Sequence, residues 1–171
     1  MHQHDIAVAC VLNGGEHRTY EDIAGVLGGS TSTAHAAVAR LRRAGILLPD
    51  DQKRLNRLAL LELLEHGVRY VFPAEPGAER LGVPTAHSAP ALAGLIDDGG
   101  ESYVWASRAG TVRGRAIEPL VPAIDTIAER APAVYDMLTL VDALRVGRAR
   151  ERELAIHLLR ERLHVPAALA L

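Results

Sequence analysis

The residues best suited to chemistry lie in one segment, Gly29 to Leu47, which reads GSTSTAHAAVARLRRAGIL. Hydroxyl side chains and a histidine open this segment, alanines fill its middle, and three arginines precede Gly45. Short polar side chains at the start of a helix can reach base edges in the major groove of duplex DNA, and arginines can bind guanine or phosphate. The segment therefore predicts a helix that contacts DNA.

A helical period of 3.6 residues divides this segment into two faces. The face expected to pack inward comprises Ala34, Ala37, Val38 and Leu41. The face expected to point outward comprises Thr33, Ala36, Arg40 and Arg43. Small alanines keep the outward face thin, so that the polar side chains near the helix start can approach the bases. The residues expected to contact DNA are Thr31, Ser32, Thr33, His35, Ala36, Arg40, Arg43, Lys53 and Arg54.

The sequence also predicts the elements before and after this helix, which must hold it in position. Residues 3–12 predict an apolar helix that ends at Asn13, and Thr19 is placed to cap a short helix that stops at Gly28. Ser30 or Ser32 can cap the helix with the arginines, and Gly45 ends it. Residues 46–48 then predict a short strand, residues 49–52 a turn, and residues 53–55 an antiparallel return.

In this order, the segment YEDIAGVLGGSTSTAHAAVARLRRAGIL and the basic hairpin after it resemble the winged helix-turn-helix domain of bacterial transcriptional regulators, the MarR-like and related groups. The resemblance covers roughly residues 1–57. Two glycines at the turn and two acids at the hairpin tip, Asp50 and Asp51, depart from the usual pattern. The resemblance implies a sequence-specific regulator that binds double-stranded DNA, and in particular a repressor.

The remainder of the chain predicts a small α+β region. We expect helices at 57–66, 91–96, 121–130, 133–146 and 148–163, a strand at 68–72 and an extended loop over 73–90. Residues 102–106 and 111–117 alternate well enough to pair as a hairpin across 107–110. The expected fold class is α+β and mostly α, with a winged helix-turn-helix domain at 1–66 and a dimerisation, sensing or partner-binding region at 67–171.

Composition narrows the classes of function. The chain has 171 residues, of which only 4% are aromatic, which disfavours a surface that stacks the bases of single-stranded nucleic acid. The net charge is −2, but residues 40–57 hold six basic against two acidic side chains. A single cysteine, Cys10, excludes an internal disulfide and favours a reducing cytoplasm. The sequence contains neither a leader pattern nor an apolar run of membrane-spanning length, so we expect a cytoplasmic protein.

No residue pattern supports an enzyme. The eight histidines lack metal-ligand spacing beside a carboxylate, so we expect no bound metal and no cofactor. Ser88 and His87 are adjacent in sequence, but no G-x-S-x-G elbow surrounds the serine, and the chain has no phosphate-binding loop motif.

The expected partners are duplex DNA and a second copy of the chain, because symmetric DNA readers usually dimerise. The terminal helices are the segment expected to form that homodimer. The alternative hypothesis is an antitoxin or adaptor, whose C-terminal half binds a partner protein such as a nucleotidyltransferase-type toxin. Residues 73–90 could line a ligand or partner pocket, or close over the core.

Overall fold

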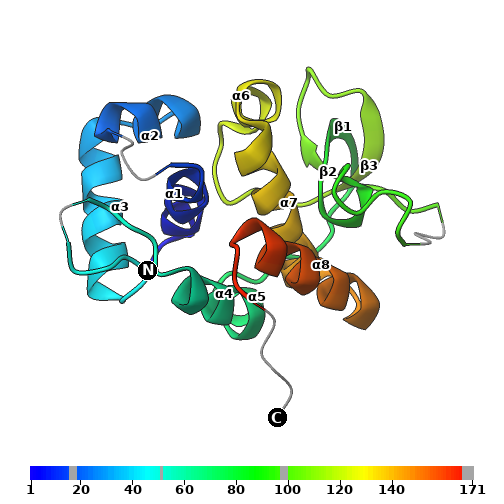
Figure 1. Cartoon of the computed structure of the whole chain (residues 1–171). Coiled ribbons are helices and arrows are strands. Elements are labelled where there is room, and N and C mark those ends of the chain that lie inside the picture. Colours follow the sequence, from blue (N-terminus) through cyan, green and yellow to red (C-terminus); the bar gives the residue numbers. More distant parts are fainter. Residues whose placement is uncertain (16–18, 51, 97–99, 167–171) are drawn as a thin grey trace, which may run out of the picture.

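The structure is a computed structural model that describes residues 1–15, 19–50, 52–96 and 100–166 (Figure 1). Its helices are α1 Gln3–Asn13, α2 Tyr20–Leu27, α3 Thr31–Arg43, α4 Arg57–His66, α5 Val68–Val71, α6 Ile124–Arg130, α7 Pro132–Val146 and α8 Ala149–Arg162. Its strands are β1 Glu79–Pro84, β2 Tyr103–Ala106 and β3 Val112–Ala116, and a 3₁₀ turn spans Ala86–Ser88. The predicted class, α+β and mostly α, is confirmed.

Helix α1 is the central element of the fold. Every residue from Asp5 to Leu12 is buried, which agrees with the apolar helix predicted there. Figure 1 shows α1 between α2 and α3 on one side and α7 on the other. The N-terminal helices are therefore packed around α1, and α1 also joins them to the C-terminal half.

The predicted caps of α2 and α3 are present. Thr19 Oγ1 accepts a hydrogen bond from Asp22 N at 3.1 Å, and the Asp22 carboxylate accepts one from Thr19 N at 2.8 Å. Gly28 ends α2 with a φ of 69°, a left-handed conformation that favours glycine. Ser30 then caps α3 by accepting from Thr33 N at 3.1 Å. The inward face predicted for α3 is confirmed, because its four residues are all buried.

The strand pair predicted after α3 is reduced to one antiparallel bridge, between Leu47 and Leu55. Two backbone hydrogen bonds flank this bridge, from Leu48 N to Arg54 O at 2.8 Å and from Asn56 N to Ile46 O at 2.9 Å. We call residues 46–56 the hairpin segment. Its direction agrees with the prediction, but it is too short to form regular strands.

Three predictions for residues 68–96 are wrong. Residues 68–71 form helix α5 rather than a strand, because Val68 packs on the core in a helical turn that continues from Gly67, with Phe72 N bonded to Val68 O. The predicted loop at 73–90 contains β1 and the 3₁₀ turn. Turns and bends occupy residues 91–96, where a helix was expected.

The hairpin predicted from residues 102–106 and 111–117 is also wrong. Strands β2 and β3 form at these positions, but they pair in parallel with each other and antiparallel with β1, which closes a small three-stranded barrel. Close backbone approaches permit this pairing. A Cβ atom at Gly82 would lie 2.0 Å from Trp105 O, and one at Gly114 would lie 2.5 Å from Ser102 O.

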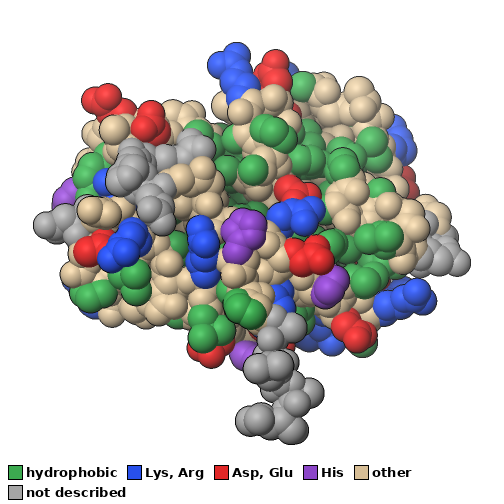
Figure 2. Space-filling view, in the orientation of Figure 1, with side chains coloured by type: hydrophobic (Ala, Val, Ile, Leu, Met, Phe, Trp, Pro, Cys, Tyr) green, Lys and Arg blue, Asp and Glu red, His purple; other side chains and the backbone are tan. Residues whose placement is uncertain are grey.

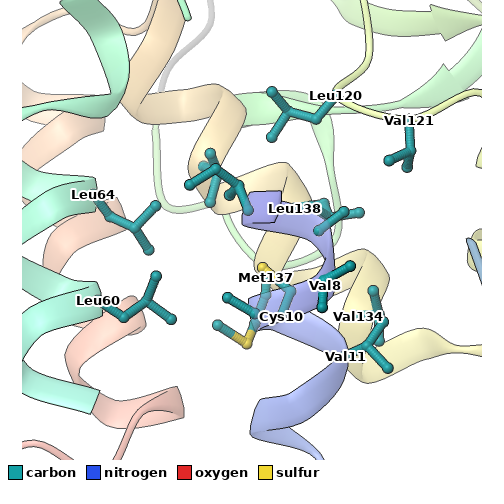
Figure 3. Packing of buried hydrophobic residues seen from close by; sticks show 14 of the residues in the cluster. Val8, Cys10, Val11, Leu60, Leu64, Leu120, Val121, Val134, Met137 and Leu138 are labelled. Carbon is teal, nitrogen blue, oxygen red and sulfur yellow. The ribbon is translucent and has the colours of Figure 1, made fainter. Parts of the chain in front are cut away.

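A single hydrophobic cluster joins both halves of the chain. Figure 3 shows part of it, in which α1 and α7 meet through Cys10 and Met137, and Leu60 of α4 faces the same space. Contacts of α1 with α7, α2 with α6 and α4 with α8 cross the predicted boundary at residue 66. The two predicted units therefore share one core, and a division into domains stays a prediction.

Candidate nucleic-acid interface

The outer face of α3 is uncovered. Its main neighbours are α1 and α2, and Figure 1 shows it at the edge of the molecule away from the barrel and α8. Thr31, Ser32, Thr33 and His35 are exposed, and Ala36 is partly exposed. The side chains predicted to reach base edges therefore lie on an accessible surface.

Two of these short side chains already have local contacts. The hydroxyls of Thr33 and Ser30 are 2.9 Å apart, and the His35 ring lies 5.1 Å from the ring of Tyr20. The side chains of Thr31 and Ser32 form no hydrogen bond with another described residue. These two residues are consequently the least restrained groups on the first turn of α3.

Arg40 is paired within the fold. Its Nε donates to Asp5 Oδ2 at 2.9 Å, and its terminal NH2 nitrogen donates to Asp5 Oδ1 at 2.7 Å. Asp5 is fully buried on α1, whereas the Arg40 side chain is 28% exposed. Burial alone would raise the pKa of Asp5, but the hydrogen bonds from Arg40 and from His2 N, together with the positive charge of Arg40, hold this pKa below its ordinary value.

This pairing changes the role that Arg40 can play. A guanidinium engaged through two nitrogens with a carboxylate has a fixed orientation and a largely neutralised charge. The pair joins the buried helix α1 to the exposed helix α3, so Arg40 acts as a positioning residue for α3. Direct contact of Arg40 with DNA stays a prediction.

The basic side chains of the hairpin segment are paired as well. Arg54 Nε donates to Asp50 Oδ2 at 2.6 Å, and Arg42 donates to the Asp50 carbonyl at 3.0 Å. The hydrogen bond from Arg54 lowers the pKa of Asp50. Lys53 adopts a φ of 55°, and its ammonium lies 5.0 Å from the centre of the Tyr20 ring. Asp51, the other acid predicted at the tip, lies outside the described residues.

Two arginines remain available after this internal pairing. Arg43 and Arg57 are exposed and form no hydrogen bond or ion pair with the described part of the chain. Arg43 was among the predicted contact residues, and Arg57, which follows the N-cap Asn56 at the start of α4, belongs to the basic stretch 40–57 and was expected to add a phosphate contact. Tyr20 was not among the residues predicted to contact DNA. The signal in the sequence was an aromatic residue next to the capping Thr19, in a chain with few aromatic residues. Its ring lies next to both the Lys53 ammonium and the His35 ring.

A second polar cluster, which the sequence did not reveal, lies inside the C-terminal half. Asp142 Oδ2 accepts hydrogen bonds from Thr85 Oγ1 at 2.8 Å and from Trp105 Nε1 at 2.6 Å, and its Oδ1 accepts from Arg145 at 2.6 Å. Burial raises the pKa of Asp142, while Arg145 and the three hydrogen bonds oppose that rise. Arg145 also donates to the Phe72 carbonyl at 2.8 Å. This cluster ties α7 to the barrel and to the end of α5.

The neighbouring His87 and Ser88 do not form a nucleophile and base. His87 Nε2 lies 2.7 Å from the Glu101 carbonyl oxygen, and Ser88 Oγ accepts a hydrogen bond from Tyr103 N at 2.8 Å. His87 Nδ1 is buried without a hydrogen bond from any described residue, and it lies 3.8 Å from Glu151 Oε2. Across the described ranges, no group of three or more His, Cys, Asp or Glu side chains is arranged to hold a metal ion.

Comparisons of the chain with models of protein families, with curated proteins and with solved structures found no match. Among the helices that the structure describes, none combines the length and the apolar character needed to cross a membrane.

Proposed function

We propose that the chain binds double-stranded DNA in a sequence-specific manner and regulates transcription as a repressor. The observation that supports this proposal most directly is the exposed start of α3. Its inward face is buried on α1 and α2, and its short polar side chains face outward at the edge of the molecule. A helix placed in this way can enter a major groove without moving any other element.

The proposed contacts differ in kind. Thr31, Ser32 and His35 reach base edges and supply sequence discrimination, because they lie on the first two turns of α3. Arg43 and Arg57 bind phosphates, and Lys53 approaches the backbone from its position over Tyr20. Arg40 holds α3 on α1 through Asp5.

The experiment is selection of genomic fragments by the purified chain, followed by titration of an enriched fragment at several salt concentrations. We expect affinity to fall with salt at a slope of about −0.9 per phosphate neutralised. Arg57→Ala should weaken binding to all sequences and reduce that slope by about one. Ser32→Ala with His35→Ala should reduce the preference for the enriched fragment over unrelated DNA.

Arg150→Ala is the matched control, because Arg150 is exposed on α8, away from α3, and loses the same charge. Its affinity should equal that of the unchanged protein. Equal losses for Arg57→Ala and Arg150→Ala would indicate only nonspecific attraction, and the absence of any enriched fragment would contradict the proposal.

A further inference from the structure

Exposed apolar side chains gather around α4 and α5. Of the six large hydrophobic residues that are exposed in the described chain, Met1, Leu58, Tyr70 and Val71 belong to or adjoin this region. Leu58 is 54% exposed, Val71 52% and Tyr70 75%. Figure 2 shows hydrophobic side chains at the lower edge of the molecule, over α4. Apolar side chains clustered in this way commonly mark an interaction site.

A hollow adjoins these side chains. It has a volume of about 650 Å³ and is lined by Met1, Ala44, Ile46, Ala59, Glu62 and Leu63, together with the end of α4. The hollow lies where the end of α3 meets the outer side of α4. Its lining is apolar apart from Glu62 and His66, so it fits an aromatic side chain, and the Glu62 carboxylate can accept a positive charge that accompanies this side chain.

Residues of α4 and α5 carry such a group. Tyr70 projects from α5, and the guanidinium of Arg69 lies 5.4 Å from the centre of its ring. Within one molecule, Tyr70 is too exposed to be filling the hollow. A second copy of the chain would therefore present to the hollow the kind of group that fits it.

The sequence pattern of this surface is self-complementary. Leu58, Glu62 and His66 recur every four residues on the exposed side of α4, and Tyr70 follows at the same spacing in α5. In an antiparallel pair about a two-fold axis near residue 64, Tyr70 of the second copy faces Leu58, next to Ala59 in the lining of the hollow. Glu62 then faces His66 of the second copy. Apolar groups meet apolar groups, and an acidic group meets a basic one.

We propose that two copies of the chain associate through the α4–α5 surface, which we define as Leu58, Glu62, His66, Arg69 and Tyr70. The interface is isologous, so each copy contributes both the aromatic group and the hollow. This placement differs from the terminal helices expected from the sequence, because most of α7 is buried in its own chain and α8 carries none of the large exposed apolar residues of the described chain.

The dimer has a consequence that rests on the proposed function. Helix α4 follows α3 in the chain, after the hairpin segment. The two-fold axis that relates the two copies of α4 therefore also relates the two copies of α3. A DNA site read by this dimer should then be an inverted repeat. The association itself requires no DNA and is tested without it.

The test is sedimentation equilibrium of the full chain over micromolar concentrations. We expect a dimer whose dissociation constant rises roughly tenfold or more in Tyr70→Glu. Leu81→Glu is the matched control, because Leu81 is exposed to a similar degree to Leu58 but lies on β1. Circular dichroism checks that each variant folds, and Leu58→Glu provides a second variant of the same surface.

An exchange of charges tests whether Glu62 pairs with His66 of the second copy. Glu62→Arg and His66→Glu should each weaken the dimer, and the two changes together should restore part of the association. A monomer at all concentrations, or a dimer unaffected by both Tyr70→Glu and Leu58→Glu, would overturn the proposal. A dimer that fails to bind DNA would contradict only the proposed function.

Discussion

Asp5 and Arg40 connect the buried helix α1 to α3, a helix with an exposed outer face. The two side chains form a bidentate ion pair with contacts of 2.7 and 2.9 Å, and the carboxylate is fully buried. Because α1 is enclosed along Asp5 to Leu12, its position is set by the whole core. The pair transmits that position to the last turn of α3 and thereby orients the face proposed to read DNA.

Removing Arg40 should destabilise the protein. Arg40→Ala leaves a buried carboxylate without its partner, and we expect the free energy of unfolding to fall by about 2 kcal/mol, a reduced value because Arg40 is partly exposed. Urea denaturation measures this change. Arg43→Ala, which alters an exposed arginine that pairs with no described residue, should cost less than about 0.5 kcal/mol. A loss of DNA affinity in Arg40→Ala without a loss of stability would instead assign Arg40 to the residues that contact DNA directly.

The same pair predicts a pH dependence. The pKa of Asp5 in the folded protein lies below its value of about 3.9 in the unfolded chain, so the unfolded state binds the proton more readily. The stabilisation is therefore complete above about pH 4 and is lost as the pH falls through the lowered pKa. We expect Asp5→Asn to flatten this part of the stability curve, measured by urea denaturation between neutral and acidic pH. An unchanged acid dependence in Asp5→Asn would show that other carboxylates account for it.

The shared core predicts a single cooperative unfolding transition. Leu60 in α4 and Leu138 in α7 lie on opposite sides of the predicted domain boundary, and both are buried in the same cluster. Leu60→Ala and Leu138→Ala should each lower the stability of the whole chain by about 2–5 kcal/mol. Circular dichroism and tryptophan fluorescence should report the same midpoint for each variant. Two separate transitions, each sensitive to one substitution, would support independent domains. Leu95→Ala, at an exposed position, is the control.

Substitution of glycine by alanine should have opposite effects on stability in the barrel and in helix α2. A Cβ atom at Gly114 would lie 2.5 Å from Ser102 O, so Gly114→Ala must displace β3 or its neighbour and should destabilise the protein by more than about 1 kcal/mol. Gly25 has open space around its Cβ position and lies within α2, so Gly25→Ala should stabilise the protein by about 0.5–1 kcal/mol. Thermal denaturation checks both values. A neutral Gly114→Ala would show that this crossing of strands is looser than the structure indicates.

Local patterns were sufficient for much of the N-terminal part. The capping box of Thr19 and Asp22, the cap at Ser30 and the buried face of α3 all depend on residues within a few positions of one another. The helix predicted at 57–66 and the one that begins near residue 148 were likewise correct, since their apolar periods are regular. The exposure of Thr33 and Arg43 followed from the same period.

Pairing between distant segments was not predictable in this way. The alternation in β2 and β3 indicated strands, but it contained no information that β1, from a proline-rich stretch, would pair with both of them. The apolar run at Val68 to Phe72 resembled a strand until the packing of α5 on α7 decided otherwise. Arg40 had the features of a free cation on an outer helix face, and its partner Asp5 lies 35 positions earlier.

The sequence by itself determined the caps of α2 and α3 and the buried face of α3, because capping and periodicity operate within a few residues of the chain. Only the tertiary structure decided which charges are free. Ion pairs such as Arg40 with Asp5 and Arg145 with Asp142, and the position of Lys53 over Tyr20, form when packing brings side chains together. The same packing left Leu58 and Tyr70 uncovered, because the core was already filled by their neighbours on α4 and α5.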